Sequence, residues 1–324
     1  MQSVDVEKTN GDARAGSLSK RDGTSSVGGQ AVIEGVMMRS MNRISIAVRQ
    51  PDGNITTKGW DFIPLGKRIK MLGIPIIRGS INLGEMLYWG LKTLDISAKI
   101  STGANIESPS KGTKLISALT LLLGLGLGIV LFVYLPLLIA TVFGFRERPV
   151  EFNIVAGIIR SLIFLSYLFL ISLMPDVKRL FQYHGAEHRT IHAFEKGEPL
   201  VVERVQKYST FHPRCGTSFI LIVAVVAIVL FAGLDAAIYL IWGFAPKPLL
   251  RMPFHLAFLP VIAGVSYEVL KLSEKLSKKS VFGKSLVAPG LWMQKITTRP
   301  PENDMVEVAI SALLDSVQNI SIAR

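Results

Sequence analysis

Long runs of apolar residues occupy the middle of the chain. Leu115–Phe143 contains no charged residue, and Thr217–Phe244 contains only Asp235. A helix needs about 20 apolar residues to cross the roughly 30 Å of hydrocarbon in a bilayer. Both runs are longer than this, so the pattern predicts two transmembrane helices.

Two other apolar segments are less regular. Phe152–Met174 carries Arg160 as its only charge. A long arginine side chain can bury its methylene groups while its charge reaches a polar region, so we expect a third span here. Phe254–Leu270 is shorter and contains Pro260 and Glu268. It is predicted to be a fourth, kinked span or a re-entrant segment.

Basic residues are distributed unevenly around these segments. Of the 36 Lys and Arg residues, 31 lie before the first apolar run, in residues 175–216 or after residue 270. Cytoplasmic segments of membrane proteins carry the excess of basic residues. Both termini and the 175–216 loop are therefore predicted to be cytoplasmic. Four crossings leave both termini on the same side of the membrane, as this prediction requires, whereas three crossings do not.

The polar segments complete the predicted organisation. Residues 1–27 are rich in Gly, Ser, Lys and Asp and are expected to be a disordered tail. Residues 28–110 are expected to form a cytoplasmic region. In it, the alternating pattern of residues 44–60 predicts a β-hairpin. The glycine-punctuated residues 64–100 predict either amphipathic helices in the membrane interface or soluble helices packed on the hairpin.

The predicted fold class is mainly α: a polytopic helical membrane protein with four spans and a cytoplasmic layer that contains a small β-hairpin and amphipathic helices. The transmembrane domain is assigned to residues 111–280, including the 175–216 loop. Residues 281–324 are assigned to a C-terminal cytoplasmic segment. There, Asn303 or Asp304 is expected to cap a short helix whose apolar face docks on the cytoplasmic layer.

Composition and charge restrict the classes of binding partner that we expect. The chain is 49% apolar with a net charge of +12. Most of its positive charge lies near span ends, where anionic lipid headgroups attract Lys and Arg, so membrane lipids are the expected partners and nucleic acid is not. Cys215 is the only cysteine, which excludes an internal disulfide.

The candidate chemistry lies in "YHGAEHRTIHAFEKGE", residues 183–198. Residues four apart on a helix share one face, so His184 and His188 can bind one ion, and so can His188 and His192. His184 and His192 are too far apart to share one. Glu187 completes the pattern His-x-x-Glu-His, in which two histidines bind zinc and the glutamate takes a proton from water.

"FHPRCG", residues 211–216, adds a second pair at the other end of the same loop, His212 and Cys215. Histidine with thiolate favours zinc, with iron as the alternative. If His184, His188, His212 and Cys215 all bind, the site is closed and structural. If three bind, a position stays open and Glu187 can act as a base. Cys215 has a second interpretation, as a small buried apolar residue.

Two arginines flank the candidate ligands. Arg189 and Arg214 are expected to bind an anionic group of a substrate, such as a phosphate or carboxylate. Arg214 also fits the role of a headgroup anchor beside a span.

The chain resembles the YqhQ-like proteins of bacteria and plastid-bearing lineages. The resemblance covers about Gly28–Ile310 and includes "GGQAVIEGVMMRS", "YHGAEHRTIHAFEKGE", "KYSTFHPRCGTSFILIV" and "APGLWMQKITTRPPENDMVEVAI". It implies an integral protein of a bacterial inner membrane or a plastid membrane, described as a predicted metal-dependent enzyme. It also implies that the metal centre is formed by His184, Glu187, His188, His212 and Cys215.

Two functions are expected to compete. One is a zinc-dependent hydrolase at the cytoplasmic membrane face, acting on a peptide or lipid-linked substrate with Glu187 as base. The other is a non-catalytic scaffold or assembly factor, with a structural metal site and a membrane-protein partner. The sequence does not determine the oligomeric state.

Overall fold

The computed structural model describes residues 27–103, 111–213, 215–277 and 281–317. The expected disordered tail lies outside the described residues except for Val27, and so does Arg214. The elements, in chain order, are β1 Gly28–Val32, β2 Gly35–Arg39, β3 Arg43–Arg49, β4 Ile55–Asp61, α2 Leu65–Arg68, η2 Lys70–Gly73, α3 Ile77–Ser101, α4 Lys111–Ile129, η3 Val130–Tyr134, α5 Leu135–Val142, α6 Pro149–Ile171, α7 Pro175–Glu195, α8 Val202–Val205, α9 Gly216–Trp242, α10 Pro248–Ser277, α11 Val281–Thr297 and α12 Asn303–Val317.

The strands form one antiparallel sheet in the order β1-β2-β3-β4. The predicted hairpin is present as β3 and β4, in which Arg43 pairs with Asp61. A second hairpin, β1 and β2, was not predicted from the sequence. Its two strands are joined by a tight turn at Ile33 and Glu34, where Glu34 has a φ of +51°. The sheet is therefore twice as large as the sequence indicated.

Alternate side chains of a strand point to opposite faces of the sheet, so both faces carry apolar side chains. Helices pack against each face. Met37 and Ile46 pack against α3, which supplies Met86 and Trp89. The opposite face packs against α12 and α7, so that the sheet lies between helices on both sides. We refer to the four strands together with α3, α7 and α12 as the sheet layer. Residues 77–101 thus form a helix packed on the sheet, one of the two alternatives predicted for this stretch.

The C-terminal helix α12 docks as predicted. It begins at Asn303, and the apolar residues Met305, Val308, Ala309 and Leu313 on one of its faces are all fully buried. They pack with Tyr183 and Ala186 of α7 in one apolar cluster. This packing fixes α7 against α12.

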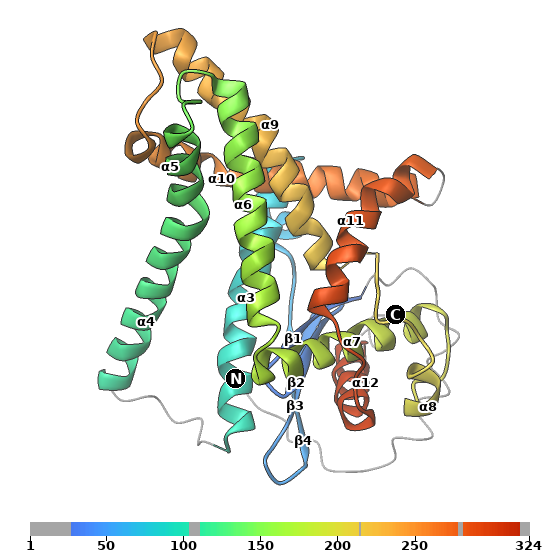
Figure 1. Ribbon diagram of the computed structural model, residues 1–324. Coiled ribbons are helices and arrows are strands. Elements are labelled where there is room, and N and C mark those ends of the chain that lie inside the picture. The colour runs from blue at the N-terminus through green and yellow to red at the C-terminus, as the bar shows by residue number, and fades with distance from the viewer. Residues whose placement is uncertain (1–26, 104–110, 214, 278–280, 318–324) are drawn as a thin grey trace.

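Within the part of the chain that the structure describes, four helices are long and apolar enough to cross a membrane: residues 119–142, 149–171, 219–242 and 248–273. These correspond to the four predicted spans. In Figure 1, α6 and α9 run side by side and α4 stands apart from them. The first of the four continues from α4 to α5 through the π-helical turn η3.

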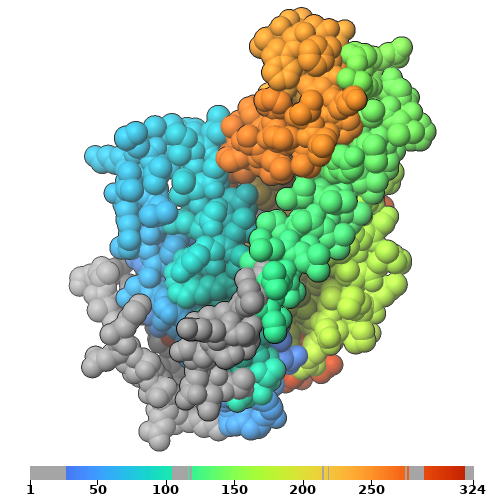
Figure 2. Space-filling model, turned by 90° about the vertical axis from the view of Figure 1, so that its left-hand side faces the viewer, coloured from blue at the N-terminus to red at the C-terminus, as the bar shows by residue number. Residues whose placement is uncertain are grey.

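Helix α10 corresponds to the fourth predicted span. It is continuous from Pro248 to Ser277, with Pro253 and Pro260 inside it. In Figure 1 it runs across the direction of α6 and α9 instead of alongside them. Figure 2 shows its orange surface directly against the cyan surface of the N-terminal part, in agreement with the packing of α10 on α3.

The contact between α3 and α10 requires glycine. A Cβ on Gly264 would lie 2.3 Å from the carbonyl oxygen of Ile76, and one on Gly79 would lie 2.9 Å from Gly264 Cα. Beside this close approach, Arg78 donates two hydrogen bonds to Glu268, at 2.7 and 2.5 Å. The contact connects the sheet layer to the apolar helices.

Candidate metal centre

Helix α7 carries the histidine motif, and its packing requires the glycine within it. A Cβ on Gly185 would lie 2.0 Å from the carbonyl oxygen of Arg299, in the segment between α11 and α12. The backbone N–H of Arg299 donates to the carbonyl of Phe181 at 2.9 Å. This segment therefore lies directly on α7, one residue from His184.

Two backbone carbonyls orient the histidine rings. His184 Nδ1 is 2.8 Å from the carbonyl oxygen of Thr297, and His188 Nδ1 is 2.5 Å from that of Thr210. A carbonyl only accepts, so each Nδ1 carries the hydrogen and each Nε2 presents its lone pair. A hydrogen bond of this kind on the second ring nitrogen is typical of metal-binding histidines.

Cys215 meets these rings from the start of α9. It is the N-cap residue of that helix, and its Sγ lies 3.4 Å from the Thr217 backbone nitrogen, which donates to it. Sγ lies 3.3 Å from His184 Nε2. The Cys215 sulfur thus lies at a helix N-terminus beside an imidazole nitrogen, within reach of an ion that this imidazole could also bind.

Ligand atoms of His184, His188 and Cys215 all lie within 4.8 Å of one another. We refer to these three residues as the metal group. A thiolate with two imidazoles whose Nε2 atoms face it is a donor set suited to zinc. The arrangement therefore fits the ion that the sequence pattern indicates. His188 and Cys215 are buried, and His184 is partly exposed.

Glu187 lies against the same atoms. Its Oε2 is 3.5 Å from His188 Nε2 and 3.9 Å from His184 Nε2. The backbone N–H of Gly29 in β1 donates a hydrogen bond to the carboxylate. Burial raises the pKa of Glu187 to about 8, against the opposing attraction of His184. Burial also holds the pKa of His188 well below 6.5, which favours the neutral, metal-binding form.

His212 does not join the metal group. Its ligand atom lies instead within 4.8 Å of those of His192 and Glu195, in a second group. His212 Nε2 is 3.6 Å from Glu195 Oε2, and its ring centroid is 4.6 Å from that of His192 but 5.6 Å from that of His188. The structure thus brings together three of the four predicted ligands and places the fourth in the adjacent group.

The backbone of His212 is held by α11. Gln294 Oε1 accepts from the His212 backbone nitrogen at 2.8 Å, and Gln294 Nε2 donates to the His212 carbonyl at 2.9 Å. Gln294 is fully buried. These two bonds fix the path of the chain just before Cys215.

The structure describes only one of the two arginines predicted to bind substrate. Arg189 donates to Gln206, which in turn donates to the carbonyl of Pro301 at 3.1 Å. The Arg189 guanidinium is therefore engaged in the contact between α7 and the start of α12, and its burial lowers its pKa. Arg214 lies outside the described residues, so its role in substrate binding stays a prediction.

Several residues of the site have no signal in the sequence. Thr210 and Thr297 contribute backbone carbonyls, which any residue type can supply. Gly29 belongs to a strand 155 positions before His184 in the sequence. His192 and Glu195 could be found, because they lie three apart on one helix, at a spacing that places both on one face.

Comparisons with known proteins agree on one family. A family model described as "Protein of unknown function (DUF1385)" matches residues 74–319. The chain is 32% identical over 315 residues to "Uncharacterized protein YqhQ" of Bacillus subtilis (strain 168), covering 91% of this chain and 93% of the relative. No solved structure matches. From the extent of both matches, the chain belongs to the DUF1385 family.

Proposed function

We propose that the protein is a zinc-dependent hydrolase with its site at the cytoplasmic membrane face and with a peptide or a lipid-linked molecule as substrate. The observation that supports this most is the convergence of four side chains from two helices. His184, His188 and Cys215 present their ligand atoms to one another, and the Glu187 carboxylate lies against them.

The number of ligands favours chemistry over a purely structural site. Catalytic zinc sites have three protein ligands and an open position, whereas structural sites have four. The metal group has three members, because His212 belongs to the second group. Zinc held there would act as a Lewis acid and lower the pKa of water.

Glu187 is placed to move the proton in such a reaction. In hydrolysis, water attacks the carbonyl carbon, and the bond from that carbon to the departing oxygen or nitrogen breaks. Glu187 takes the proton from the attacking water and passes it to the departing atom. Burial raises its pKa to about 8, and a divalent cation held by the metal group would lower that pKa and favour the carboxylate form that accepts the proton.

The membrane location rests on the four apolar helices and on the basic residues around them. Cys215 directly precedes α9, one of the four, so the metal group lies at the end of a candidate span. The Lys and Arg distribution assigns this end of α9, and both chain termini, to the cytoplasmic side. Membrane lipids are then the immediate neighbours of the site.

The test compares the protein with Glu187→Gln in vesicles supplied with a panel of phospholipids and short peptides, with products detected by mass spectrometry. We expect Glu187→Gln to keep its metal and to lose turnover by about 100-fold or more, the usual contribution of a general base. Glu203→Gln, an exposed glutamate in α8, serves as the control. Unchanged turnover in Glu187→Gln contradicts the proposal.

One observation favours the scaffold as a second candidate. Leu87, Tyr88 and Leu91 form an exposed apolar ridge on α3, each about 60% exposed. Exposed apolar ridges are typical of surfaces that contact another protein or a membrane. If the protein is a scaffold, Glu187→Gln keeps metal, stability and cellular function together, which separates the two candidates.

A further inference from the structure

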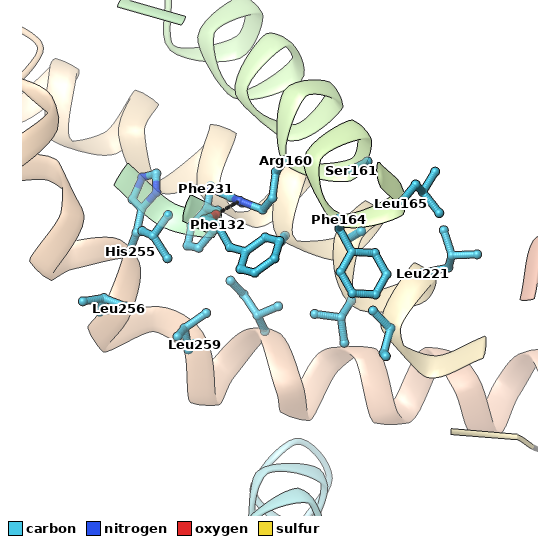
Figure 3. A pocket seen from close by; sticks show the side chains of 16 residues that line it. Phe132, Arg160, Ser161, Phe164, Leu165, Leu221, Phe231, His255, Leu256 and Leu259 are labelled. Carbon is cyan, nitrogen blue, oxygen red and sulfur yellow. Dashed lines mark hydrogen bonds between the residues drawn. The ribbon is translucent and has the colours of Figure 1, made fainter. Parts of the chain in front are cut away.

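The apolar helices line a partly open cavity of about 270 Å³. Its walls come from the middle of α6, from α9, from α10 and from Phe132 and Val133 of the π-helical turn η3, and they are almost entirely apolar. Figure 3 shows it extending from Phe231 and His255 at one end to Leu221 and Leu165 at the other. A cavity of this size is close to the smallest ligand pockets, at about 300 Å³.

Arg160 is the one charged residue among those that line the cavity, and its guanidinium group contacts other groups of the protein. Arg160 Nε donates to the carbonyl oxygen of Phe132 at 2.8 Å, and the guanidinium lies over the ring of Phe231 at 5.4 Å. The arginine therefore contributes mainly its methylene groups to the cavity. A ligand in the cavity has almost no polar partner there, so the part of it that binds must be hydrocarbon.

The position of the cavity relates it to the metal group. Cys215 caps α9, and Ile220 and Leu221 of the same helix line the cavity. At about 1.5 Å per residue, Ile220 lies about 7.5 Å along the helix from Cys215, and Phe231 lies about 24 Å from it. The cavity thus starts little more than one helical turn from a residue of the metal group and extends away from it along α9.

The structure also connects the two through packed side chains. Phe164 and Leu221 line the cavity and belong to an apolar cluster with Met293 and Ile296 of α11. Ile296 precedes Thr297, whose carbonyl holds the ring of His184. The end of the cavity near Leu221 therefore points toward the metal group.

We propose that this cavity binds the hydrocarbon chain of a lipid whose polar end lies at the metal group. Given the proposed hydrolase, the substrate is then a lipid and not a peptide. Between candidate spans, the ligand that reaches the cavity from the surroundings is membrane lipid. A lipid of the leaflet next to the sheet layer has its polar end at the depth of Cys215 and its chain at the depth of the cavity.

The experiment uses the full chain in phosphatidylcholine vesicles that contain one of two photoactivatable phospholipids, with a diazirine at the chain end or at the polar end. We expect the chain-end probe to label lining residues such as Leu221 and Phe164. The polar-end probe is expected to label the region of Cys215 and α7. As the mole fraction of either probe is raised, this labelling should reach a plateau, because a cavity saturates, whereas labelling of the general lipid-facing surface should rise in proportion.

Matched variants on α9 separate the cavity from that surface. Ala224→Phe fills the cavity and should lower labelling of the lining residues about tenfold, equivalent to about 1.4 kcal/mol of binding free energy. Val225→Phe, at an exposed neighbour outside the cavity, should leave labelling unchanged. Equal labelling in the two variants, or labelling of the lining residues that does not saturate, overturns the proposal.

A third variant separates this inference from the proposed function. His188→Ala should lose metal and keep both labelling patterns, because the cavity does not depend on the ion. Labelling without metal in the unmodified protein would leave the lipid site and remove the hydrolase. Bound metal without saturable labelling would leave the hydrolase and remove the lipid site.

Discussion

The backbone of Gly29 in β1 and the carboxylate side chain of Glu187 in α7 are packed directly against each other. A Cβ on Gly29 would lie 2.7 Å from Glu187 Cγ and 2.8 Å from the carbonyl oxygen of Met37. A rotation of the backbone at residue 29 alone would not move the added Cβ away from both atoms. Strand β1 therefore fixes the position of the proposed base.

Gly29→Ala is predicted to displace Glu187. Overpacking of this kind costs about 1–3 kcal/mol, so the thermal unfolding midpoint should fall, and turnover should fall with it. Intrinsic fluorescence of the detergent-solubilised protein measures the midpoint. Gly28→Ala is the control, because its Cβ would meet nothing within 4 Å. Equal midpoints for the two variants would show that the contact is unimportant.

Gly185→Ala is predicted to weaken metal binding without changing a ligand. The added Cβ would push the Arg299 backbone away from α7 and remove the Thr297 carbonyl from His184 Nδ1. Loss of such an orienting hydrogen bond lowers metal affinity about 10- to 100-fold. Competition with a chromophoric chelator measures the affinity, and Gly84→Ala, at an open position on α3, should leave it unchanged. An unchanged affinity in Gly185→Ala would show that the Thr297 carbonyl does not orient the ring.

Gln294→Leu is predicted to destabilise the loop that carries His212. It removes both hydrogen bonds to the His212 backbone and leaves a buried donor and acceptor unpaired, at a cost of about 1–3 kcal/mol each. Lys295→Ala, at the exposed neighbouring position, should change the free energy of unfolding by less than about 0.5 kcal/mol. If both variants unfold at the same denaturant concentration, Gln294 does not hold the loop.

Gly264→Ala is predicted to separate α3 from α10. Its Cβ would lie 2.3 Å from the Ile76 carbonyl oxygen, which is backbone and cannot move alone. Gly233→Ala in α9 meets nothing within 4 Å and should stabilise its helix by about 0.5–1 kcal/mol. Thermal unfolding of the two variants should therefore shift in opposite directions. A shift in the same direction contradicts the close approach of the two helices.

The apolar pattern predicted the candidate spans because length and hydropathy are local properties. The β1–β2 hairpin was missed because paired glycines and Glu34 interrupt its apolar run, and the strands are defined by pairing with β3. The sequence left α11 unassigned, with Pro289 inside it. Proline inside a helix usually signals a kink or a break, so Pro260 left a re-entrant segment open as the alternative to the full span that α10 provides.

Within the site, too, the features set by local spacing were predicted, and the features that depend on distant residues were not. The pairing of His184 and His188 follows from helix geometry, so four-residue spacing predicted it. The approach of Cys215 was predicted only from its place at a span entrance. The placement of His212 beside His192 depends on the path of the loop around Gln294, which no local pattern encodes.

Elemental analysis of the purified protein and of two histidine variants tests the central claim most directly. We predict about one zinc or iron ion per chain bound by the metal group, its loss in His188→Ala, and its retention in His192→Ala, because His192 belongs to the second group. Equal metal content in the protein and in His188→Ala, or no metal in either, would contradict the account.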